Sequence, residues 1–259
     1  MILTDQLNRE IYIKETPKRI VSLVPSQTEL LADLGLVEAI VGVTKFCVHP
    51  KDLRKQKTIV GGTKLINVDK IKALKPDIIL CNKEENSHEV VESLKNIAPI
   101  HISDIYNLED AFELFKMYGI LFRVEEKVNT LILKIKEERL KFKILTKNQL
   151  KQKAAYFIWQ NPWMVVGSNT YIDAMLREAN LNNVFASELR YLDIDIEHPK
   201  LKEAEVIMLS SEPYPFKQKH IETLKINFPD KKIMLVDGEM FSWYGSRLKL
   251  SYNYFNQFL

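Results

Sequence analysis

The middle of the chain, residues 123–145, reads RVEEKVNTLILKIKEERLKFKIL, and this stretch decides the fold. Its apolar residues recur at helical spacing, as Val124, Val128, Leu131, Ile132, Ile135 and Leu140. No Gly or Pro interrupts the run, so it would form a helix roughly 35 Å long at about 1.5 Å per residue. One long helix at the midpoint indicates two halves joined by a helical backbone. The alternative is an ordinary surface helix of a single domain.

Strands and helices alternate before this helix. Residues 19–25 (RIVSLVP) form a short apolar run that predicts a buried strand. A helix at 27–34 follows directly, with Ser26 and Glu29 as a capping box and Gly35 as its stop. The same patterns predict strands at 38–44, 77–80 and 98–103, and helices at 68–74 and 107–122. This alternation predicts a parallel sheet with helices on both faces.

The second half repeats the order. Strands are predicted at 154–160, 204–209 and 232–237, and a helix at 170–180. Matching positions in the two halves are Gly35 with Asn180, Asp69 with Glu197, and Asp77 with Glu205. We therefore predict an α/β fold of two Rossmann-like lobes with parallel sheets, joined by one long backbone helix. The predicted division is an N-terminal lobe at 1–122, the helix at 123–146 and a C-terminal lobe at 147–259.

Composition excludes several functions. The chain has 259 residues, 46% of them apolar, and a net charge of +3 from 37 basic and 34 acidic residues, which gives no reason to expect nucleic acid as a partner. Cys47 and Cys81 have neither zinc-ribbon nor redox spacing. Charged residues interrupt the first 25 positions, so no signal peptide is expected, and the chain as written is expected to be cytoplasmic. No run reaches the length of a membrane span, and we expect a monomer.

Common catalytic motifs are missing from the sequence. There is no nucleophile elbow, no phosphate-binding loop of the G-x-x-x-x-G-K-[ST] type and no dinucleotide fingerprint. The segment VGGTK at 60–64 is rich in glycine but does not connect a strand to a helix as these motifs require, so it is interpreted as a plain loop.

Ligands of open α/β sheets bind at the carboxyl ends of the strands, and this rule selects candidate loops. Trp159 falls inside a predicted strand and is assigned to the core. Aromatic faces with a few polar anchors suit a large, flat or lobed ligand. The predicted ligand-binding residues are Phe46, His49, Asn82, Lys83, Glu84, Trp163, Met164, Arg190, Tyr191, Phe241, Trp243, Tyr244 and Arg247.

Metal coordination is weighed separately. Cys47 and His49 lie two residues apart, and Glu84, Glu85 and His88 lie on another loop of the same half. These residue types suit zinc, iron or cobalt, but no spacing is diagnostic. A lining or hydrogen-bonding role for His49 is therefore favoured over direct coordination.

Several segments resemble a known family. They are RIVSLVPSQTELLADLG, VGVTKFCVHP and INVDKIKALKPDIILCNKEEN, followed by NPWMVVG and SSEP in the second half. In this order they resemble the helical-backbone periplasmic substrate-binding proteins of ABC importers for cobalamin, haem and ferric siderophores, over roughly residues 17–250. The resemblance implies two α/β lobes, one long helix, a ligand cleft between the lobes and a periplasmic location. It also implies that Asp69 and Glu197 dock to the arginines of a membrane permease.

The resulting hypothesis is a non-enzymatic binding protein for a metal chelate, without an intrinsic cofactor. It would serve an ABC-type importer or be a cytosolic relative of such a protein, for example a sensor or carrier. The alternative is a chelatase-like enzyme that inserts a metal into a tetrapyrrole, with His49 and Glu84 or Glu85 as its base.

The segment GEMFSWYGSR at 238–247 follows the last predicted strand. We expect Phe241, Trp243 or Tyr244 to stack on the ligand, with Glu239 or Arg247 as a polar anchor.

Overall fold

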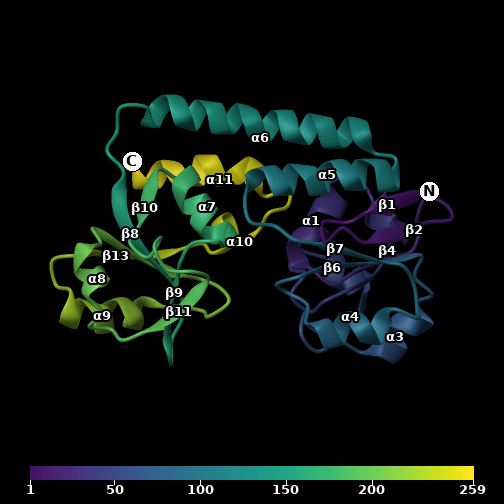
Figure 1. Cartoon of the computed structure of the whole chain (residues 1–259), viewed down its shortest axis with the longest axis horizontal. Coiled ribbons are helices and arrows are strands. Elements are labelled where there is room, and N and C mark those ends of the chain that lie inside the picture. The colour runs from purple at the N-terminus through teal and green to yellow at the C-terminus, as the bar shows by residue number, and fades with distance from the viewer. The chain divides into compact units, whose positions relative to one another are not determined.

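The computed structural model describes residues 1–259, which form two compact α/β units. Unit 1 comprises Met1–Ile105, Glu109–Ile135 and Tyr244–Arg247. Unit 2 comprises Tyr106–Leu108, Lys136–Trp243 and Leu248–Leu259. The predicted α/β class and the presence of two lobes are confirmed (Figure 1). The two units are interleaved in sequence, because a short C-terminal segment belongs to unit 1.

Unit 1 is built on a five-stranded parallel sheet of order β5-β4-β3-β6-β7. Its strands are β3 (Ile20–Ser22), β4 (Ile40–Val43), β5 (Thr58–Ile59), β6 (Ile78–Asn82) and β7 (Ile100–Ser103). An antiparallel hairpin, β1 (Ile2–Thr4) with β2 (Glu10–Tyr12), precedes them. The sequence patterns did not predict this hairpin, because each of its strands has only three residues.

Helices cover both faces of this sheet, as predicted (Figure 1). They are α1 (Pro25–Asp33), α2 (Leu53–Gln56), α3 (Val68–Ala73), α4 (His88–Leu94) and α5 (Leu108–Phe122), with a 3₁₀ turn at Val37–Ala39. Side chains of a strand alternate between the faces. Ile79 and Cys81 of β6 therefore join Ile71 of α3 and Leu94 of α4 in one buried cluster.

Unit 2 contains a six-stranded sheet that is mixed, whereas a parallel sheet was predicted. The order is β11-β9-β8-β12-β13, with β10 beside β8. Its strands are β8 (Gln152–Trp159), β9 (Trp163–Val166), β10 (Leu181–Asn183), β11 (Tyr191–Ile194), β12 (Val206–Ser210) and β13 (Lys232–Val236). Strands β8, β10, β12 and β13 are parallel, while β9 and β11 form an antiparallel extension.

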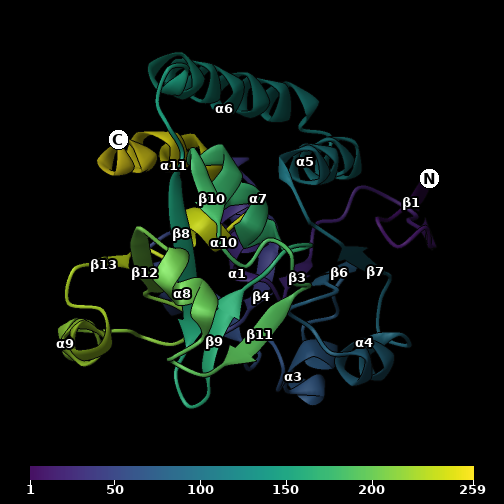
Figure 2. The same ribbon diagram turned by 60° about the vertical axis from the view of Figure 1, so that its left-hand side comes forward.

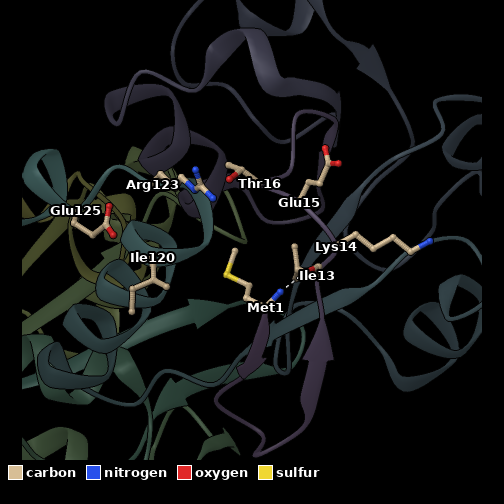
Figure 3. A pocket seen from close by; sticks show the side chains of 8 residues that line it. All are labelled: Met1, Ile13, Lys14, Glu15, Thr16, Ile120, Arg123 and Glu125. Carbon is tan, nitrogen blue, oxygen red and sulfur yellow. Dashed lines mark hydrogen bonds between the residues drawn. The ribbon is translucent and has the colours of Figure 1, made fainter.

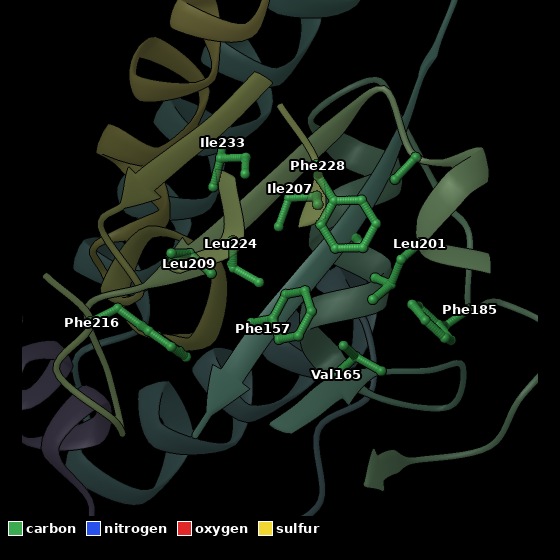
Figure 4. Close-up of a cluster of buried hydrophobic side chains, with 12 residues drawn as sticks. Phe157, Val165, Phe185, Leu201, Ile207, Leu209, Phe216, Leu224, Phe228 and Ile233 are labelled. Carbon is green, nitrogen blue, oxygen red and sulfur yellow. The ribbon is translucent and has the colours of Figure 1, made fainter. Parts of the chain in front are cut away.

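The helices of unit 2 lie on both faces of its sheet (Figure 2). They are α7 (Tyr171–Glu178), α8 (Pro199–Glu203), α9 (Gln218–Asn227), α10 (Glu239–Ser242) and α11 (Leu248–Phe255), with a 3₁₀ turn at Asn256–Phe258. Phe157 of β8 packs with Leu201 of α8 and Leu224 of α9 (Figure 4). The preceding residue, Tyr156, faces the other side and contacts Phe241 of α10.

The long central helix is α6 (Glu125–Thr146). Arg123 has a φ of 56°, a left-handed conformation that ends α5 and separates it from α6. The predicted helix is therefore confirmed with a start two residues later. A membrane-spanning helix is absent from the structure.

The predicted capping box of α1 is wrong. The helix begins at Pro25, and its cap residue, Val24, makes no side-chain cap hydrogen bond. Proline is favoured at the first helical position because its missing N–H has no partner there in any case. Glu29 is thereby left available for an ion pair with Arg247.

The two units share a backbone device that supports the internal repeat. In unit 1 the N–H of Asp77 donates to the Arg19 carbonyl over 2.8 Å, and the N–H of Arg19 donates to the Asp77 carboxylate over 2.9 Å. In unit 2 the N–H of Glu205 donates to the Lys153 carbonyl over 2.8 Å, and the N–H of Lys153 donates to the Glu205 carboxylate over 2.7 Å. We call these reciprocal pairs the Asp77 clasp and the Glu205 clasp.

Both helix stops of the repeat also match. Gly35 after α1 has a φ of 80°, and Asn180 after α7 has a φ of 60°. Glycine and asparagine are the residues that adopt this left-handed conformation most readily.

Candidate functional site

The candidate loops of unit 1 follow β4 and β6 at the carboxyl edge of its sheet. Asn82 ends β6 and is 3% exposed. Its side-chain oxygen accepts hydrogen bonds from the N–H groups of Glu84 (2.9 Å) and Glu85 (3.1 Å), and its amide donates to Ser103 Oγ (3.0 Å). Asn82 therefore shapes the loop, and this burial does not fit the predicted ligand contact.

Phe46 presents the largest open aromatic face of this edge. Its side chain is 48% exposed, and the Lys45 ammonium lies 5.0 Å from the ring centroid. The ring lies over Gly62, where an added Cβ would come within 3.2 Å of Phe46 Cε2. The glycine-rich segment 60–64, interpreted from sequence as a plain loop, thus packs against the Phe46 ring at Gly62.

The other polar candidates of unit 1 lie on the same edge. Lys83 pairs with Asp104 at 2.6 Å, which holds its ammonium close to a carboxylate. The backbone carbonyl of Glu84 accepts a hydrogen bond from Lys64 Nζ at 2.6 Å. The 60–64 loop and the loop after β6 are therefore joined, and Lys64 is a residue of this edge that the sequence patterns did not identify.

His49 and Cys47 are placed differently. His49 is half-buried, whereas the Cys47 thiol is fully buried, 3.1 Å from Thr28 Oγ1 and 3.2 Å from Thr44 Oγ1. Burial raises the pKa of the Cys47 thiol, which disfavours the thiolate that a metal would bind. No group of three or more His, Cys, Asp and Glu side chains is placed to hold a metal ion.

Two tryptophans of unit 2 differ in exposure from the expectation that Trp159 lies in the core and Trp163 faces the ligand. Trp159, assigned to the core from sequence, is 39% exposed at the end of β8 and packs its ring against Tyr214 at 5.5 Å. Trp163 is half-buried and stacks on Phe216 at 6.1 Å, beside the core cluster. Met164, next in β9, is also half-buried. Trp159 is thus the more open aromatic face.

Arg190 and Tyr191 lie apart from the other candidates of unit 2. Tyr191 pairs with Val166, while Ile194 at the other end of β11 pairs with Trp163. The Arg190 guanidinium donates to the Asn169 carbonyl over 2.8 Å and lies 5.4 Å from the Tyr191 ring centroid. Both residues are therefore at the end of β11 that is remote from Trp163.

Glu212 organises the loops after β12 and β13. Its carboxylate accepts hydrogen bonds from Ser242 Oγ and, over 3.0 Å, from Trp243 Nε1. Burial raises the pKa of Glu212, and these two hydrogen bonds offset part of that shift. A neighbouring phenol, Tyr214, donates to Gln160 over 2.9 Å. The hydrogen bond from Trp243 Nε1 to Glu212 therefore fixes the Trp243 side chain against the loop after β12.

Phe241 is fully buried and belongs to the core of unit 2. Its ring contacts Tyr156 at 5.2 Å and Phe255 at 5.0 Å between centroids. A ring with no exposed surface cannot stack on a ligand in this conformation, so the predicted role of Phe241 does not fit the structure. Trp243, 7% exposed, retains only a small open surface.

The end of the same segment belongs to unit 1. Arg247 makes a bidentate ion pair with Glu29, with Nε–Oε2 at 3.0 Å and a terminal nitrogen to Oε1 at 2.6 Å. Burial raises the pKa of Glu29, and the Arg247 guanidinium opposes this shift. Arg247 therefore acts as a structural anchor on α1, in place of the expected ligand anchor.

Tyr244 is part of a buried polar network of unit 1. Its hydroxyl accepts a hydrogen bond from Gln27 Nε2 over 3.2 Å, and Tyr118 donates to Gln27 Oε1 over 2.6 Å. Burial raises the pKa of the Tyr244 hydroxyl. At Gly245 an added Cβ would lie 2.3 Å from the Ser26 carbonyl oxygen, so only glycine allows this close approach to α1.

A cavity of about 460 Å³ lies elsewhere in unit 1 (Figure 3). It is lined by Met1, Ile13, Lys14, Glu15, Thr16, Ile120, Arg123 and Glu125. None of the predicted ligand residues is among them. Two cationic and two carboxylate side chains line the cavity, so its side chains favour neither an anionic nor a cationic ligand.

The proposed docking residues are both exposed. Asp69 lies in the first turn of α3, and Glu197 precedes α8 by two residues. They occupy matching places in the two units. Asp69 lies within α3, the helix that leads into β6, and Glu197 lies just before α8, the helix that leads into β12.

Fold and loops together define a protein of two α/β units that share one long helix, with aromatic and polar loops at the carboxyl edges of the sheets. Residues 20–228 match the family described as periplasmic binding protein, and the chain belongs to this family. The resemblance found in the sequence is thereby confirmed.

Individual proteins agree with this assignment. The uncharacterized ABC transporter substrate-binding lipoprotein YvrC of Bacillus subtilis is 28% identical over 206 residues, which cover 75% of this chain and 64% of YvrC. A vitamin B12-binding protein of Pectobacterium carotovorum is 35% identical over 95 residues, covering 36% of this chain and 34% of that protein. The chain thus spans less than two thirds of the length of these curated relatives.

A solved structure shows the same fold. A periplasmic heme binding protein from Pseudomonas aeruginosa superposes with a TM-score of 0.80 at 21% identity, covering 93% of this chain and 92% of that one.

Proposed function

We propose that this chain is the substrate-binding component of an ABC-type importer and that its ligand is a metal chelate of the corrinoid, haem or ferric siderophore class. Membership of the periplasmic binding protein family is the observation that carries the proposal. The names of the relatives support the ligand class, since they include vitamin B12-binding proteins.

Ligand contacts in this proposal come from the carboxyl-edge loops of both sheets. Phe46 and Trp159 offer exposed aromatic faces, which suit the wide apolar surface of a tetrapyrrole or siderophore. His49, Lys83 and Glu84 supply polar groups on the loops of unit 1, and Trp163, Met164 and Trp243 contribute smaller surfaces in unit 2.

The protein would act by binding alone, as a monomer without a resident cofactor. The relatives are named as binding proteins, and no observation favours the chelatase alternative. The family description and the lipoprotein relative support a place outside the cytoplasm, beside a membrane permease.

Permease docking would use Asp69 and Glu197. Exposed carboxylates suit arginine partners because guanidinium and carboxylate pair through two hydrogen bonds. The expected result is that Asp69→Lys with Glu197→Lys abolishes stimulation of a reconstituted permease while ligand affinity stays unchanged. Full stimulation by the double variant would contradict the docking role.

Calorimetric titration of the full chain with cyanocobalamin, haemin and a ferric siderophore tests the ligand class. We expect saturable binding of at least one of them with a Kd in the micromolar range or tighter. Binding of none of the three would overturn the proposed ligand class.

A variant pair then tests the site. Phe46→Ala should raise the Kd for the ligand about tenfold, because an exposed aromatic face in the site is lost. Tyr12→Ala is the matched control, since Tyr12 is 65% exposed but lies on the β1–β2 hairpin. If the two substitutions changed the Kd equally, Phe46 would not be a residue of the ligand site.

A further inference from the structure

The second half of α6, in unit 2, carries apolar side chains that the unit leaves uncovered. Phe142 is buried and packs on Phe255 of α11, whose ribbon runs beside α6 in Figure 1. Leu140 and Ile144 lie two residues to either side of Phe142 and are 61% and 65% exposed. At about 100° per residue, they point away from the packed side of the helix.

Two further exposed aliphatic side chains follow Ile144, and the first of them, Leu145, lies about 100° around the helix from it. Leu145 is 58% exposed and Leu150, in the turn after α6, is 95% exposed. Single exposed leucines are ordinary, but four large aliphatic side chains within eleven residues are a concentration that calls for a partner. We call Leu140, Ile144, Leu145 and Leu150, with the lysines between residues 136 and 153, the α6 surface.

Positive charge surrounds these side chains. Residues 136–153 contain seven basic and two acidic residues, a net charge of +5, whereas the whole chain carries only +3. By helical position, Lys136 and Lys143 flank the Leu140–Ile144 stripe on one side and Lys141 flanks it on the other, while Lys147 follows the end of the helix. Within this region Lys141 pairs with Glu137 and Glu138, and Glu178 pairs with Arg139 and lies 3.6 Å from Lys143. Glu137 and Glu138 are already counted in the net charge, so the region remains basic after Glu178 is added.

The composition indicates which partner fits. Interfaces between proteins are enriched in aromatic residues and Arg and depleted in Lys, whereas the α6 surface has aliphatic side chains, six lysines and no exposed aromatic ring. Leucines flanked by lysines on one helix face are typical of helices that lie on lipid headgroups. A second copy of this chain would bring a like charge, which opposes association through this surface.

We propose that the α6 surface binds peripherally to an anionic lipid surface. The four aliphatic side chains enter the headgroup boundary, and the surrounding lysines contact lipid phosphates. This inference goes beyond the proposed function and does not depend on ligand binding or on a permease.

Co-sedimentation of the full chain with two kinds of vesicles tests the proposal. One kind is pure phosphatidylcholine and the other contains about one third phosphatidylglycerol, which supplies the negative surface potential. We expect binding to the anionic vesicles that weakens with added salt, because salt screens the lysines. Equal binding to both kinds, or binding to neither, would overturn the proposal.

Variants separate the two contributions. Lys147→Gln with Lys151→Gln should weaken binding roughly thirtyfold, at about 1 kcal/mol for each lysine near the surface. Ile144→Ser with Leu145→Ser should weaken it by about tenfold or more, because apolar area is no longer buried. All four positions are exposed, so the fold should be unaffected, which thermal unfolding of each variant checks.

Ile226→Ser with Lys219→Gln provides the matched control. Ile226 is 80% exposed on α9 of the same unit, with Lys219 on the same helix. This variant should bind anionic vesicles as the unchanged protein does. If it lost as much vesicle binding as the α6 variants, binding would not depend on the α6 surface and the proposal would be overturned. Binding to immobilised poly-glutamate without binding to vesicles would assign the surface to an acidic protein and overturn the proposal.

Discussion

The two units use the same device at one edge of their sheets and different chemistry at the other. The Asp77 clasp and the Glu205 clasp precede β6 and β12, and the reciprocal pair of hydrogen bonds in one has its counterpart in the other. The Asp77 carboxylate accepts one more backbone hydrogen bond, from the N–H of Lys18 over 2.8 Å. At the carboxyl ends of the same strands, Asn82 holds the loop of unit 1 with its amide, while Glu212 holds the loops of unit 2 with a carboxylate. Residues that only begin a strand can stay alike, whereas residues that hold the loops at the carboxyl edge differ because the loops of the two units differ.

The segment 238–247 is itself divided between the two units. Phe241 and Trp243 belong to unit 2, where one fills the core and the other is held by Glu212. Tyr244 and Arg247 belong to unit 1, where they bind Gln27 and Glu29 of α1. A segment that sequence presents as one aromatic loop is therefore two anchors, one in each unit.

The largest expected effect is on the unit 2 anchor. Phe241→Ala removes a fully buried ring and should lower the free energy of unfolding by about 3–5 kcal/mol, since the lost transfer energy adds to the cost of a cavity. Chemical denaturation measures it. A change below 1 kcal/mol would mean that the ring contributes little to the core and would reopen a ligand role.

A large pH effect on stability should arise from His101 of unit 1. His101 on β7 is buried, neither ring nitrogen has a hydrogen-bond partner, and burial lowers its pKa to about 4 from the usual 6.5. The unfolded chain therefore binds a proton at higher pH than the folded chain does, so stability falls as pH drops from about 6.5 to 4. The loss should be about 3 kcal/mol.

Comparison with His101→Leu isolates this contribution. The variant should lose less stability than the unchanged protein between pH 7 and pH 4, measured by urea unfolding at each pH. Parallel pH profiles for the two proteins would show that His101 does not titrate as its burial implies.

The unit 1 anchor should be nearly as sensitive. Arg247→Met leaves the Glu29 carboxylate buried without its cation and should cost about 2–3 kcal/mol. Glu29→Gln combined with Arg247→Met should recover much of that loss, because no charge then remains unpaired. A double variant whose loss equals the sum of the single losses would show that the two groups are not coupled.

The smallest effects should come from the clasps, and the Asp77 clasp should be the more sensitive of the two. Asp77→Ala removes the acceptor of two backbone hydrogen bonds and Glu205→Ala removes the acceptor of one, both at exposed positions, so losses of about 1–2 and about 1 kcal/mol are expected. Thermal unfolding of both variants checks this. A larger loss at Glu205 than at Asp77 would argue that the number of backbone hydrogen bonds does not decide what each clasp contributes.

Much of the fold could be predicted because the parallel strands are continuous apolar runs and the helix stops are chemically distinct. The helix 123–145 and the stops at Gly35 and Asn180 needed only local patterns. The hairpin β1–β2 and the antiparallel strands β9 and β11 were missed, because strands of three or four residues give too few positions for an alternation to be recognised.

The site was less accessible to sequence reasoning. Trp159 shares the parity of buried Phe157, so alternation places it in the core, yet it lies at the end of β8 and is exposed. Arg247 and Glu29 are 218 residues apart, and no local pattern predicts their ion pair. Gly62 gives a weak signal, since two adjacent glycines mark a close approach without naming Phe46 as its partner.

Hydrogen exchange with and without a bound chelate tests the central claim most directly, which is that the carboxyl-edge loops of both sheets carry the function. We predict slower exchange in the segments 44–49, 61–66, 82–86, 159–164 and 211–216 when ligand is added, and unchanged exchange around the Asp77 and Glu205 clasps. Protection confined to the clasp edge, or to only one of the two units, would contradict the account.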